Sequence, residues 1–212
     1  MRKIFITGIG TGVGKTIVSS IITEALQADY WKPIQTGSGD GKDSDVVRKL
    51  ISNNKTIIYP EAYLLAKPAS PFAAAEEAGI KIEIKDIPIP KTDNILVIEG
   101  AGGLMVPINE EELMIDMIEQ WNAEVILVSQ NYLGSVNHTM LSCMALTDRN
   151  LKVLGIVYNG EDTLMAERSV LSFCDYPVIG RIKPEREFTP EKVSSYAKKF
   201  LSTFTSLLTN NI

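Results

Sequence analysis

Short runs of hydrophobic residues alternate with longer amphipathic segments along the whole chain. The runs are continuous stretches of Val, Ile and Leu, which is typical of strands that are covered on both faces in a parallel sheet. They predict strands over Lys3–Thr7, Tyr30–Ile34, Asn94–Glu99, Glu124–Ser129, Lys152–Tyr158 and Pro177–Ile179. Helical periodicity predicts helices over Lys15–Ala28, Asp43–Asn53, Pro71–Ala78, Glu110–Asn122, Val136–Asn150, Thr163–Cys174 and Pro190–Leu208.

The alternation of strands and helices predicts an α/β fold with a doubly wound, mostly parallel sheet and helices on both faces. Residues 1–212 are expected to form a single domain, because no stretch has the composition of a linker. An irregular connection is expected over Lys81–Asp93, which contains two prolines. Sheets of this kind bind ligands at the carboxyl ends of their strands, so the residues that follow each strand are the candidates for chemistry.

Composition narrows the function classes. Hydrophobic residues make up 45% of 212 residues, which is ordinary for a globular protein, and the formal net charge is −5. This charge offers no electrostatic argument for nucleic acid or an anionic membrane as a partner. No apolar stretch is long enough for a signal peptide or a membrane span. The two cysteines, Cys143 and Cys174, lack a metal-type spacing and fit a reducing compartment, so we expect a cytoplasmic protein.

The first predicted strand runs into the glycine-rich segment TGIGTGVGKT at Thr7–Thr16 and then into a helix. In such a loop, backbone N–H groups surround an anion, Lys15 reaches the phosphates and the Thr16 hydroxyl binds Mg²⁺. The helix N-terminus adds a partial positive charge. The expected backbone contacts are Thr11, Gly12, Val13 and Gly14. This context predicts a nucleotide-binding fold of the P-loop NTPase type.

The spacing of this loop departs from the usual pattern. The pattern G-x-x-x-x-G-K-[ST] would require glycine at Ile9, whereas glycine stands at Gly8 and Gly10 instead. The alternative interpretation is a glycine-rich turn with a surface lysine, and the strand–helix context favours phosphate binding.

A second lysine follows the second predicted strand. Lys32 precedes Pro33, which keeps the lysine backbone extended, and a glycine-rich loop with Thr36 comes next. At the carboxyl edge of the sheet, Lys32 would face the same crevice as Lys15. A second cation there can hold a transferring phosphoryl group or an anionic intermediate. The alternative is a strand-end lysine whose ammonium group reaches water.

Acidic residues at two positions are candidates for Mg²⁺ binding. Glu99 ends the apolar run ILVIE, a position where nucleotide hydrolases keep a Mg²⁺-binding acid, and the glycine-rich segment Gly100–Gly103 follows it. Asp43 and Asp45 begin a predicted helix. Such aspartates are usually helix caps, although one of them could bind Mg²⁺ together with phosphate oxygens and water.

Polar groups also follow the fourth and fifth predicted strands. The N–H groups at the helix start Gly134–Asn137 could hold a carboxylate. Asn159 could read an adenine edge, although Asn-Gly is more often only a turn. His138 has no neighbour that would complete a Ser/His/Asp or Cys/His arrangement, so we expect it on a helix surface.

Four motifs occur in order: TGIGTGVGKT at Thr7–Thr16, KPIQTG at Lys32–Gly37, EGAGG at Glu99–Gly103 and LGSVNHTML at Leu133–Leu141. With these motifs the chain resembles the dethiobiotin synthetase family, the ATP-dependent cyclo-ligases of biotin synthesis. The resemblance implies that 7,8-diaminopelargonate takes up CO₂ as a carbamate. The carbamate is then phosphorylated by ATP to a carbamic–phosphoric anhydride. The second amine closes the ring of dethiobiotin, and ADP and phosphate are released.

The resemblance also implies roles for individual residues. Lys32 and Lys15 resemble the catalytic lysines, and the Mg²⁺ ligands would be Thr16, Asp45 and Glu99. Nucleotide contacts would come from Thr11, Gly12, Val13, Gly14, Lys15, Thr16, Asp45, Glu99, Gly100, Ala101, Gly102 and Asn159. Substrate contacts would come from Thr36 and from Gly134, Ser135, Val136 and Asn137, the last four across a homodimer interface.

Three positions depart from the family pattern, namely Gly12, Gly160 and the Lys183–Glu185 segment. All three lie on the nucleotide side, and they leave the choice of nucleoside triphosphate open. Two other enzyme or switch classes share the architecture: amidotransferase-type synthetases and partition-type ATPases. The first normally need a glutaminase domain, and the second carry an additional lysine near the start of the loop. A module that only binds nucleotide is the third alternative.

Overall fold

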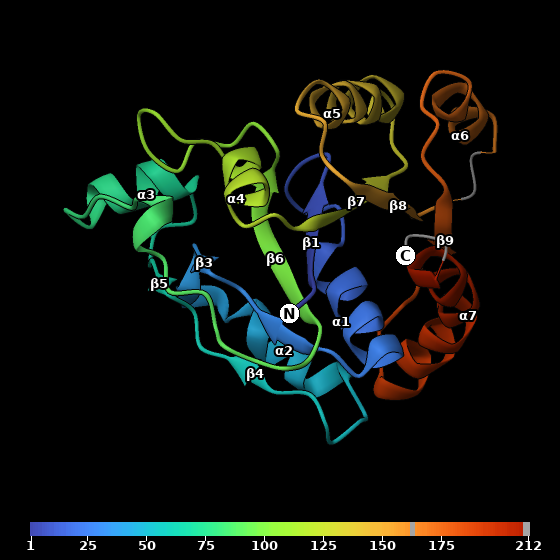
Figure 1. Cartoon of the computed structure of the whole chain (residues 1–212), viewed down its shortest axis with the longest axis horizontal. Coiled ribbons are helices and arrows are strands. Elements are labelled where there is room, and N and C mark those ends of the chain that lie inside the picture. The colour runs from blue at the N-terminus through green and yellow to red at the C-terminus, as the bar shows by residue number, and fades with distance from the viewer. Residues whose placement is uncertain (162–163, 210–212) are drawn as a thin grey trace.

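The computed structural model describes residues 1–161 and 164–209, and its centre is a seven-stranded sheet (Figure 1). The strand order is β4-β2-β6-β1-β7-β8-β9, and neighbouring strands run parallel. These strands are β1 (Lys3–Gly8), β2 (Asp29–Trp31), β4 (Ile58–Tyr59), β6 (Leu96–Gly103), β7 (Glu124–Gln130), β8 (Val153–Asn159) and β9 (Val178–Ile182). A separate two-stranded parallel sheet pairs β3 (Ile34–Gln35) with β5 (Tyr63–Leu64).

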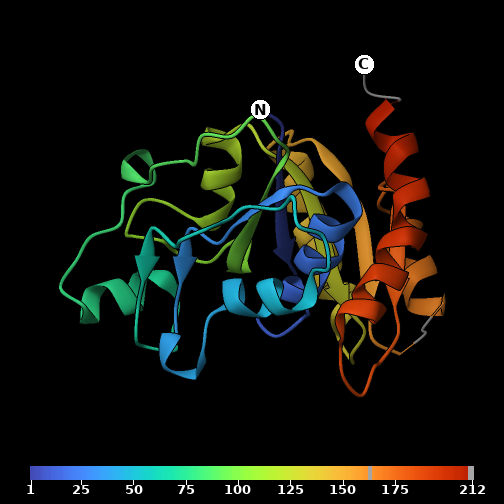
Figure 2. The same ribbon diagram turned by 90° about the horizontal axis from the view of Figure 1, so that it is seen from below.

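Helices cover both faces of the large sheet. They are α1 (Lys15–Leu26), α2 (Asp43–Leu50), α3 (Pro71–Glu77), α4 (Met114–Gln120), α5 (Ser135–Asp148), α6 (Leu164–Leu171) and α7 (Pro190–Thr209). Two short 3₁₀ helices are η1 (Ser38–Asp40) and η2 (Ile84–Asp86). In Figure 1, α4, α5 and α6 lie on one side of the sheet and α1, α2 and α7 on the other. Figure 2 shows α3 and α7 at opposite ends of the molecule.

The two faces bury separate hydrophobic cores. In β1, Phe5 packs into the core under α4 and α5, whereas its neighbours Ile4 and Ile6 pack into the core under α1 and α7. Successive side chains of a strand point to opposite faces, so a strand covered on both sides must be apolar at every position. This explains the continuous apolar runs and confirms the prediction of a doubly wound parallel sheet with helices on both faces.

Several predicted boundaries were wrong. The strand expected over Tyr30–Ile34 is interrupted at Lys32-Pro33, and its two halves belong to different sheets. The helix expected over Glu110–Asn122 begins only at Met114. The short strands β4 and β5 had no counterpart in the prediction, because two-residue pairings leave no periodicity to read. Thr163, where one helix was expected to begin, lies outside the described residues.

The strand order determines where loops meet. β1 lies between β6 and β7, and β2 lies next to β6, so the carboxyl ends of β1, β6 and β2 open at neighbouring positions on one edge. From β1 the chain crosses over β6 to reach β2, whereas from β6 it crosses over β1 to reach β7. The crossovers that follow these two neighbouring strands therefore run in opposite directions across the sheet. Doubly wound sheets form a crevice at such a switch point. Of the helices within the described ranges, none combines the length and apolar character that crossing a bilayer requires.

Candidate functional site

A cavity of about 710 Å³ lies at this edge of the sheet. Loops after β1, β2 and β6 line it, together with the start of α2 and the segment that leads into α3. The lining residues are Thr11, Gly12, Gly14, Lys15, Thr16, Ile17, Lys32, Gln35, Thr36, Gly37, Asp43, Pro68, Ala69, Ser70, Pro71, Glu99, Ala101, Gly102 and Val106. Residues from three of the four motifs, far apart in sequence, therefore share one space, and the fourth motif, Leu133–Leu141, contributes none of them.

The loop after β1 is tightly built around glycine. Gly14 precedes α1 with a φ of 96°, a left-handed conformation that glycine adopts without strain. A Cβ atom at Gly14 would lie 2.3 Å from the Asn159 side-chain nitrogen. That amide donates a hydrogen bond of 2.9 Å to the Val13 carbonyl. Asn159 thus fixes the loop at Val13. On the cavity side, Lys15 donates a hydrogen bond of 2.7 Å to the Gly10 carbonyl.

Gly8 explains the unusual glycine spacing. A Cβ atom at Gly8 would lie 2.5 Å from a methyl group of Val13, so the loop folds back directly over the end of β1. Position 9 does not require glycine in this structure. The Ile9 side chain is partly buried and packs against both hydrophobic cores. The loop can therefore approach the end of β1 closely because glycine stands at position 8, one residue before the position that the usual pattern assigns to it.

Lys32 is the centre of a buried polar cluster. Its Nζ lies 2.5 Å from an Asp43 carboxylate oxygen and 3.0 Å from Glu99 Oε1, and it also donates to the Gly100 carbonyl at 3.3 Å. Thr16 donates to the same Glu99 oxygen at 2.9 Å. Lys32 is 4% exposed and Glu99 is 1% exposed, so these charges interact with little screening by water.

The cluster shifts the pKa values of its members. Burial lowers the pKa of Lys15 to about 8, and the neighbouring Lys32 ammonium adds to this effect. Burial alone would lower the pKa of Lys32 as well, but the Glu99 and Asp43 carboxylates outweigh it and raise that pKa. The same pairing with Lys32 outweighs burial at Asp43 and lowers its pKa. Burial and Glu99 raise the pKa of Tyr30, which remains a hydrogen-bond donor.

The oxygen donors of the cavity suit a hard cation. Among the described residues, no three His, Cys, Asp or Glu side chains are grouped so that they could hold a metal by themselves. Mg²⁺ commonly takes only one or two carboxylates and completes its shell with phosphate oxygens and water. The cavity offers the Thr16 hydroxyl with the carboxylates of Asp43 and Glu99, so the donor chemistry fits Mg²⁺.

Asp45 does not lie where the resemblance implied. Its carboxylate forms a hydrogen-bonded ion pair of 2.7 Å with Arg48 one turn along α2, and it is absent from the cavity lining. The residue that faces Lys32 is Asp43, at the first position of the same helix. Residues two apart on a helix point about 200° apart around its axis, so only one of the two aspartates can face the cavity.

The expected substrate residues at the start of α5 also lie outside this cavity. Gly134 has a φ of 98° and precedes the helix, and Ser135 is buried while Asn137 is exposed. None of the four residues Gly134, Ser135, Val136 and Asn137 lines the cavity. Within one copy of the described chain, this helix start and the lysine cluster are therefore separate features.

Two groups that line the cavity, and one buried beside Glu99, were not singled out from the sequence. Gln35 accepts a hydrogen bond of 3.0 Å from the Asp43 backbone N–H and so stabilises the start of α2. The Tyr30 hydroxyl donates to Glu99 Oε2 at 2.9 Å. Pro68–Pro71 closes one side of the cavity. The proline pair could have marked the last segment as a rigid loop, but no local pattern indicates the first two contacts.

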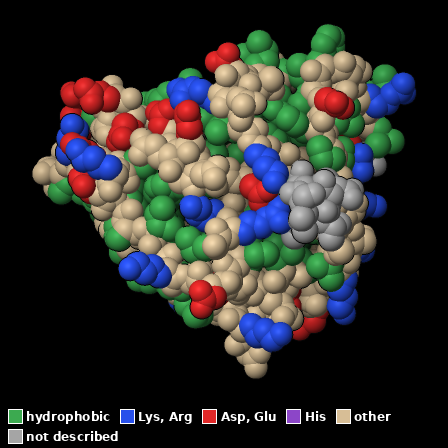
Figure 3. All heavy atoms as spheres, viewed as in Figure 1, with side chains coloured by type: hydrophobic (Ala, Val, Ile, Leu, Met, Phe, Trp, Pro, Cys, Tyr) green, Lys and Arg blue, Asp and Glu red, His purple; other side chains and the backbone are tan. Residues whose placement is uncertain are grey.

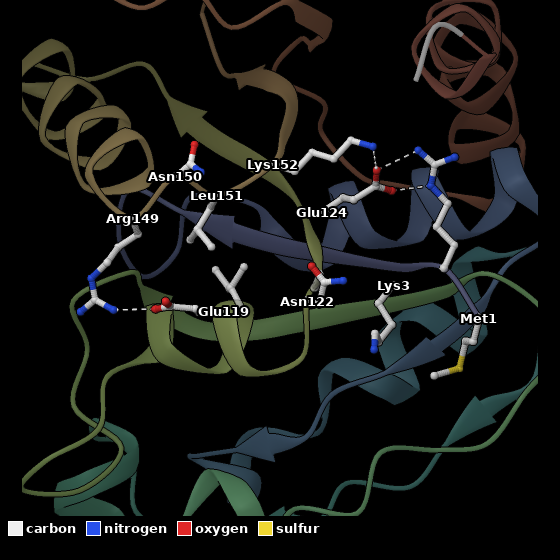
Figure 4. Close-up of a pocket in the computed structure, with 12 residues that line it drawn as sticks. Met1, Lys3, Glu119, Asn122, Glu124, Arg149, Asn150, Leu151 and Lys152 are labelled. Atoms are coloured by element: carbon white, nitrogen blue, oxygen red, sulfur yellow. Dashed lines mark hydrogen bonds and ion pairs between the residues drawn. The ribbon is translucent and has the colours of Figure 1, made fainter. Parts of the chain in front are cut away.

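A second hollow, of about 610 Å³, lies at the opposite edge, where β1, β7 and β8 begin (Figure 4). Its charged groups are largely paired with one another. Glu124 binds Arg2 and also Lys152 at 2.6 Å, and Arg149 binds Glu119 at 2.8 Å. None of the four sequence motifs reaches this hollow. Three of the four motifs contribute residues to the first cavity, which is therefore the candidate site.

Comparisons with known proteins show the family of this chain. A family model described as an AAA domain matches residues 2–192. A Cytophaga hutchinsonii protein named ATP-dependent dethiobiotin synthetase BioD is 47% identical over 205 residues, which are 96% of this chain and 99% of that protein. A Christiangramia forsetii protein of the same name is 49% identical over 199 residues, which are 94% of this chain and 96% of that protein.

Solved structures show the fold in more distant proteins. The septum site-determining protein MinD from Pyrococcus horikoshii, in complex with Mg-ADP, has a TM-score of 0.58 at 20% identity and covers 97% of this chain and 93% of its own. The cell division ATPase MinD from Pyrococcus furiosus has a TM-score of 0.59 at 19% identity, with 98% and 100% covered. At this identity the likeness extends to the fold alone, which is of the P-loop NTPase type.

Proposed function

The chain belongs to the dethiobiotin synthetase family of ATP-dependent ligases, and we propose that it converts 7,8-diaminopelargonate, CO₂ and ATP to dethiobiotin, ADP and phosphate. The observation that carries the proposal is the convergence of Lys15, Lys32 and Glu99 on one cavity, which Thr36 also lines. We take residues 1–212 as one catalytic domain for this reaction.

Each step of the reaction places negative charge on oxygen atoms. CO₂ adds to one amine of the substrate, which loses a proton and becomes a carbamate. A carbamate oxygen then attacks the terminal phosphorus of ATP and displaces ADP. The resulting carbamic–phosphoric anhydride is attacked at carbon by the second amine, which closes the ring and expels phosphate. Buried cations stabilise such charge without reorganising, because they are held in place before the reaction starts.

The two lysines have separate tasks in this proposal. Lys15 follows the glycine-rich loop and would bind the terminal phosphates of ATP. Lys32 is held between two carboxylates and would contact the carbamate and the transferring phosphoryl group. Its raised pKa keeps it charged at neutral pH. Thr36 follows Lys32 in the same loop and would contact the substrate.

We propose that Thr16, Asp43 and Glu99 hold Mg²⁺ when the nucleotide is bound. When bound there, the ion would neutralise phosphate charge and hold the terminal phosphate in line with its acceptor. Asp43 takes the place that the resemblance gave to Asp45, because the Asp43 side chain lies beside Lys32. The expected contacts of Thr11, Gly12, Val13, Gly14, Gly100, Ala101, Gly102 and Asn159 with the nucleotide stay part of the proposal.

We propose a homodimer in which the start of α5 meets the substrate carboxylate in the partner's site. Hydrophobic side chains lie at the surface over α5 and α6 (Figure 3). Leu133, Leu141 and Met144 are exposed along or just before α5. Exposed apolar surface of this kind is common at interfaces between subunits. The cytoplasmic location stays a prediction that depends on the two unpaired cysteines.

The test is a phosphate-release assay with ATP, Mg²⁺ and bicarbonate, run with and without 7,8-diaminopelargonate. We expect phosphate release to depend on the diamine and to match the dethiobiotin formed in a ratio near one. Several nucleoside triphosphates should be compared, because the departures on the nucleotide side leave that preference open. Phosphate release that ignores the diamine would favour a partition-type nucleotide switch instead.

A further inference from the structure

We propose that Tyr30 is a positioning residue that sets the orientation of the Glu99 carboxylate for Mg²⁺. This inference rests on the proposed function in one respect, because it takes Glu99 as a metal ligand. Nothing in the sequence motifs points to Tyr30, which lies two residues before the KPIQTG segment. The inference comes from one hydrogen bond and from the register of two strands.

The register places the two side chains side by side. Tyr30 of β2 is paired with Val97 of β6. Glu99 is two residues beyond Val97, so its side chain points to the same face of the sheet. The Tyr30 hydroxyl reaches along this face and donates to Glu99 Oε2 at 2.9 Å. Tyr30 is fully buried and Glu99 is 1% exposed, so no solvent competes for this contact.

The two oxygens of Glu99 have different partners. Oε2 accepts from Tyr30, and Oε1 accepts from Thr16 at 2.9 Å and from Lys32 at 3.0 Å. The tyrosine therefore binds one carboxylate oxygen and leaves the other, which Thr16 and Lys32 contact, for the proposed metal position. Without the hydroxyl, Oε2 would be buried without a described partner, and the carboxylate would lose the contact that fixes its rotation.

Residues that hold a metal ligand in place affect metal binding strongly. Removing such a partner typically lowers metal affinity by about 10- to 100-fold. Tyr30→Phe keeps the ring, which packs in the core under α1, and removes only the hydroxyl. The expected effect is thus confined to the orientation of Glu99 and leaves ATP contacts of the glycine-rich loop in place.

A matched control is available in the same sheet. Tyr158 of β8 is also buried, and its hydroxyl is among the buried atoms of the described chain for which no hydrogen-bond partner is found. Tyr158→Phe therefore removes a buried tyrosine hydroxyl that does not touch Glu99. The pair of variants separates the loss of a hydroxyl as such from the loss of this particular contact.

The experiment titrates Mg²⁺ into each protein with ATP present and measures nucleotide binding by calorimetry. We expect Y30F to require about 10-fold more Mg²⁺ than the wild type. Binding of ATP in EDTA should be unchanged, and Y158F should match the wild type. In the diamine assay, Y30F should regain a kcat within about twofold of the wild type at saturating Mg²⁺, as expected for a role in metal binding alone. An unchanged Mg²⁺ requirement in Y30F would overturn the proposal.

A double variant tests whether Tyr30 acts through Glu99. In the Glu99→Gln background, adding Y30F should raise the Mg²⁺ requirement by less than about twofold, because the contact is already altered. A full additional loss would contradict the proposal. The calorimetric result does not need turnover, so an inactive wild type with a normal Mg²⁺ effect would refute the proposed function and leave the role of Tyr30 intact.

A wild-type measurement covers the case in which Y30F does not fold. With tyrosine labelled at the ring carbon that bears the hydroxyl, the Tyr30 resonance should move when Mg²⁺ is added to the ATP complex. The Tyr158 resonance should stay in place. A Tyr30 resonance that ignores Mg²⁺ would contradict the contact with a metal ligand.

Discussion

Replacing Lys32 by alanine should destabilise the protein and not merely inactivate it. The substitution removes a buried ammonium that lies 2.5 Å from Asp43 and 3.0 Å from Glu99. Two carboxylates would then face each other in a cavity wall without their shared cation. Breaking a buried ion pair in this way typically costs about 3–5 kcal/mol. For a chain of this size the melting temperature should fall by roughly 6–20 °C.

The assay is urea denaturation of the purified variant in EDTA at pH 7, compared with the wild type. Lys81→Ala is the control, because Lys81 lies 3.2 Å from Glu83 and the two side chains are 59% and 29% exposed. Exposed pairs of this kind contribute little to stability. Adding Mg²⁺ should restore part of the loss in the Lys32 variant, since a cation that binds only the folded state stabilises it.

The pH dependence gives an independent check with a definite sign. Lys32 lowers the pKa of Asp43 in the folded state. The pair therefore stabilises the fold above the unfolded pKa of about 3.9, and this contribution is lost as the pH falls through the lower folded pKa. The stability gap between wild type and variant should be full at pH 7 and should narrow in strong acid.

Two results would refute this reasoning about Lys32. One is a variant that unfolds within about 1 kcal/mol of the wild type at pH 7, below the range for a broken buried pair. The other is a gap that does not change on acidification. The same variant should lose turnover while it still binds ATP, because Lys15 would contact the nucleotide. Loss of ATP binding together with turnover would contradict the separate tasks of the two lysines.

Three further predictions concern the site and its surroundings. Asp43→Asn should raise the Mg²⁺ requirement of nucleotide binding by about 10-fold or more, whereas Asp45→Asn should change it by less than about twofold, and the reverse order would restore Asp45 as the ligand. Because the pKa of Lys15 is about 8 and phosphate favours its charged form, ATP affinity should fall as the pH rises above 8. Calorimetry in buffers of different ionisation enthalpy should then show proton uptake on binding at high pH only. Leu141→Glu on α5 should yield monomers in light scattering, whereas Leu201→Glu on α7 should not, and a Leu141 variant that stays dimeric would place the interface elsewhere.

Local patterns were sufficient for most of the fold. A strand buried on both faces must be apolar throughout, and an amphipathic helix must repeat its apolar positions every three to four residues, so both kinds of element can be read from short windows. The glycine-rich loop could also be recognised locally, because its backbone conformation restricts residue type at particular positions. The convergence of Lys15, Lys32 and Glu99 followed from the rule that parallel strands end at one edge of the sheet.

Only the tertiary structure decided between neighbouring residues and between partners. Whether Asp43 or Asp45 enters the cavity depends on the rotation of α2, which the Gln35 contact and the packing of the helix determine. The pairing of Tyr30 with Glu99 depends on the register of β2 against β6, across 69 residues of sequence. Sequence periodicity specifies which face of an element is buried, but it does not specify the rotation of a helix or the register of a strand relative to its neighbours. Those follow from packing, which only the folded chain establishes.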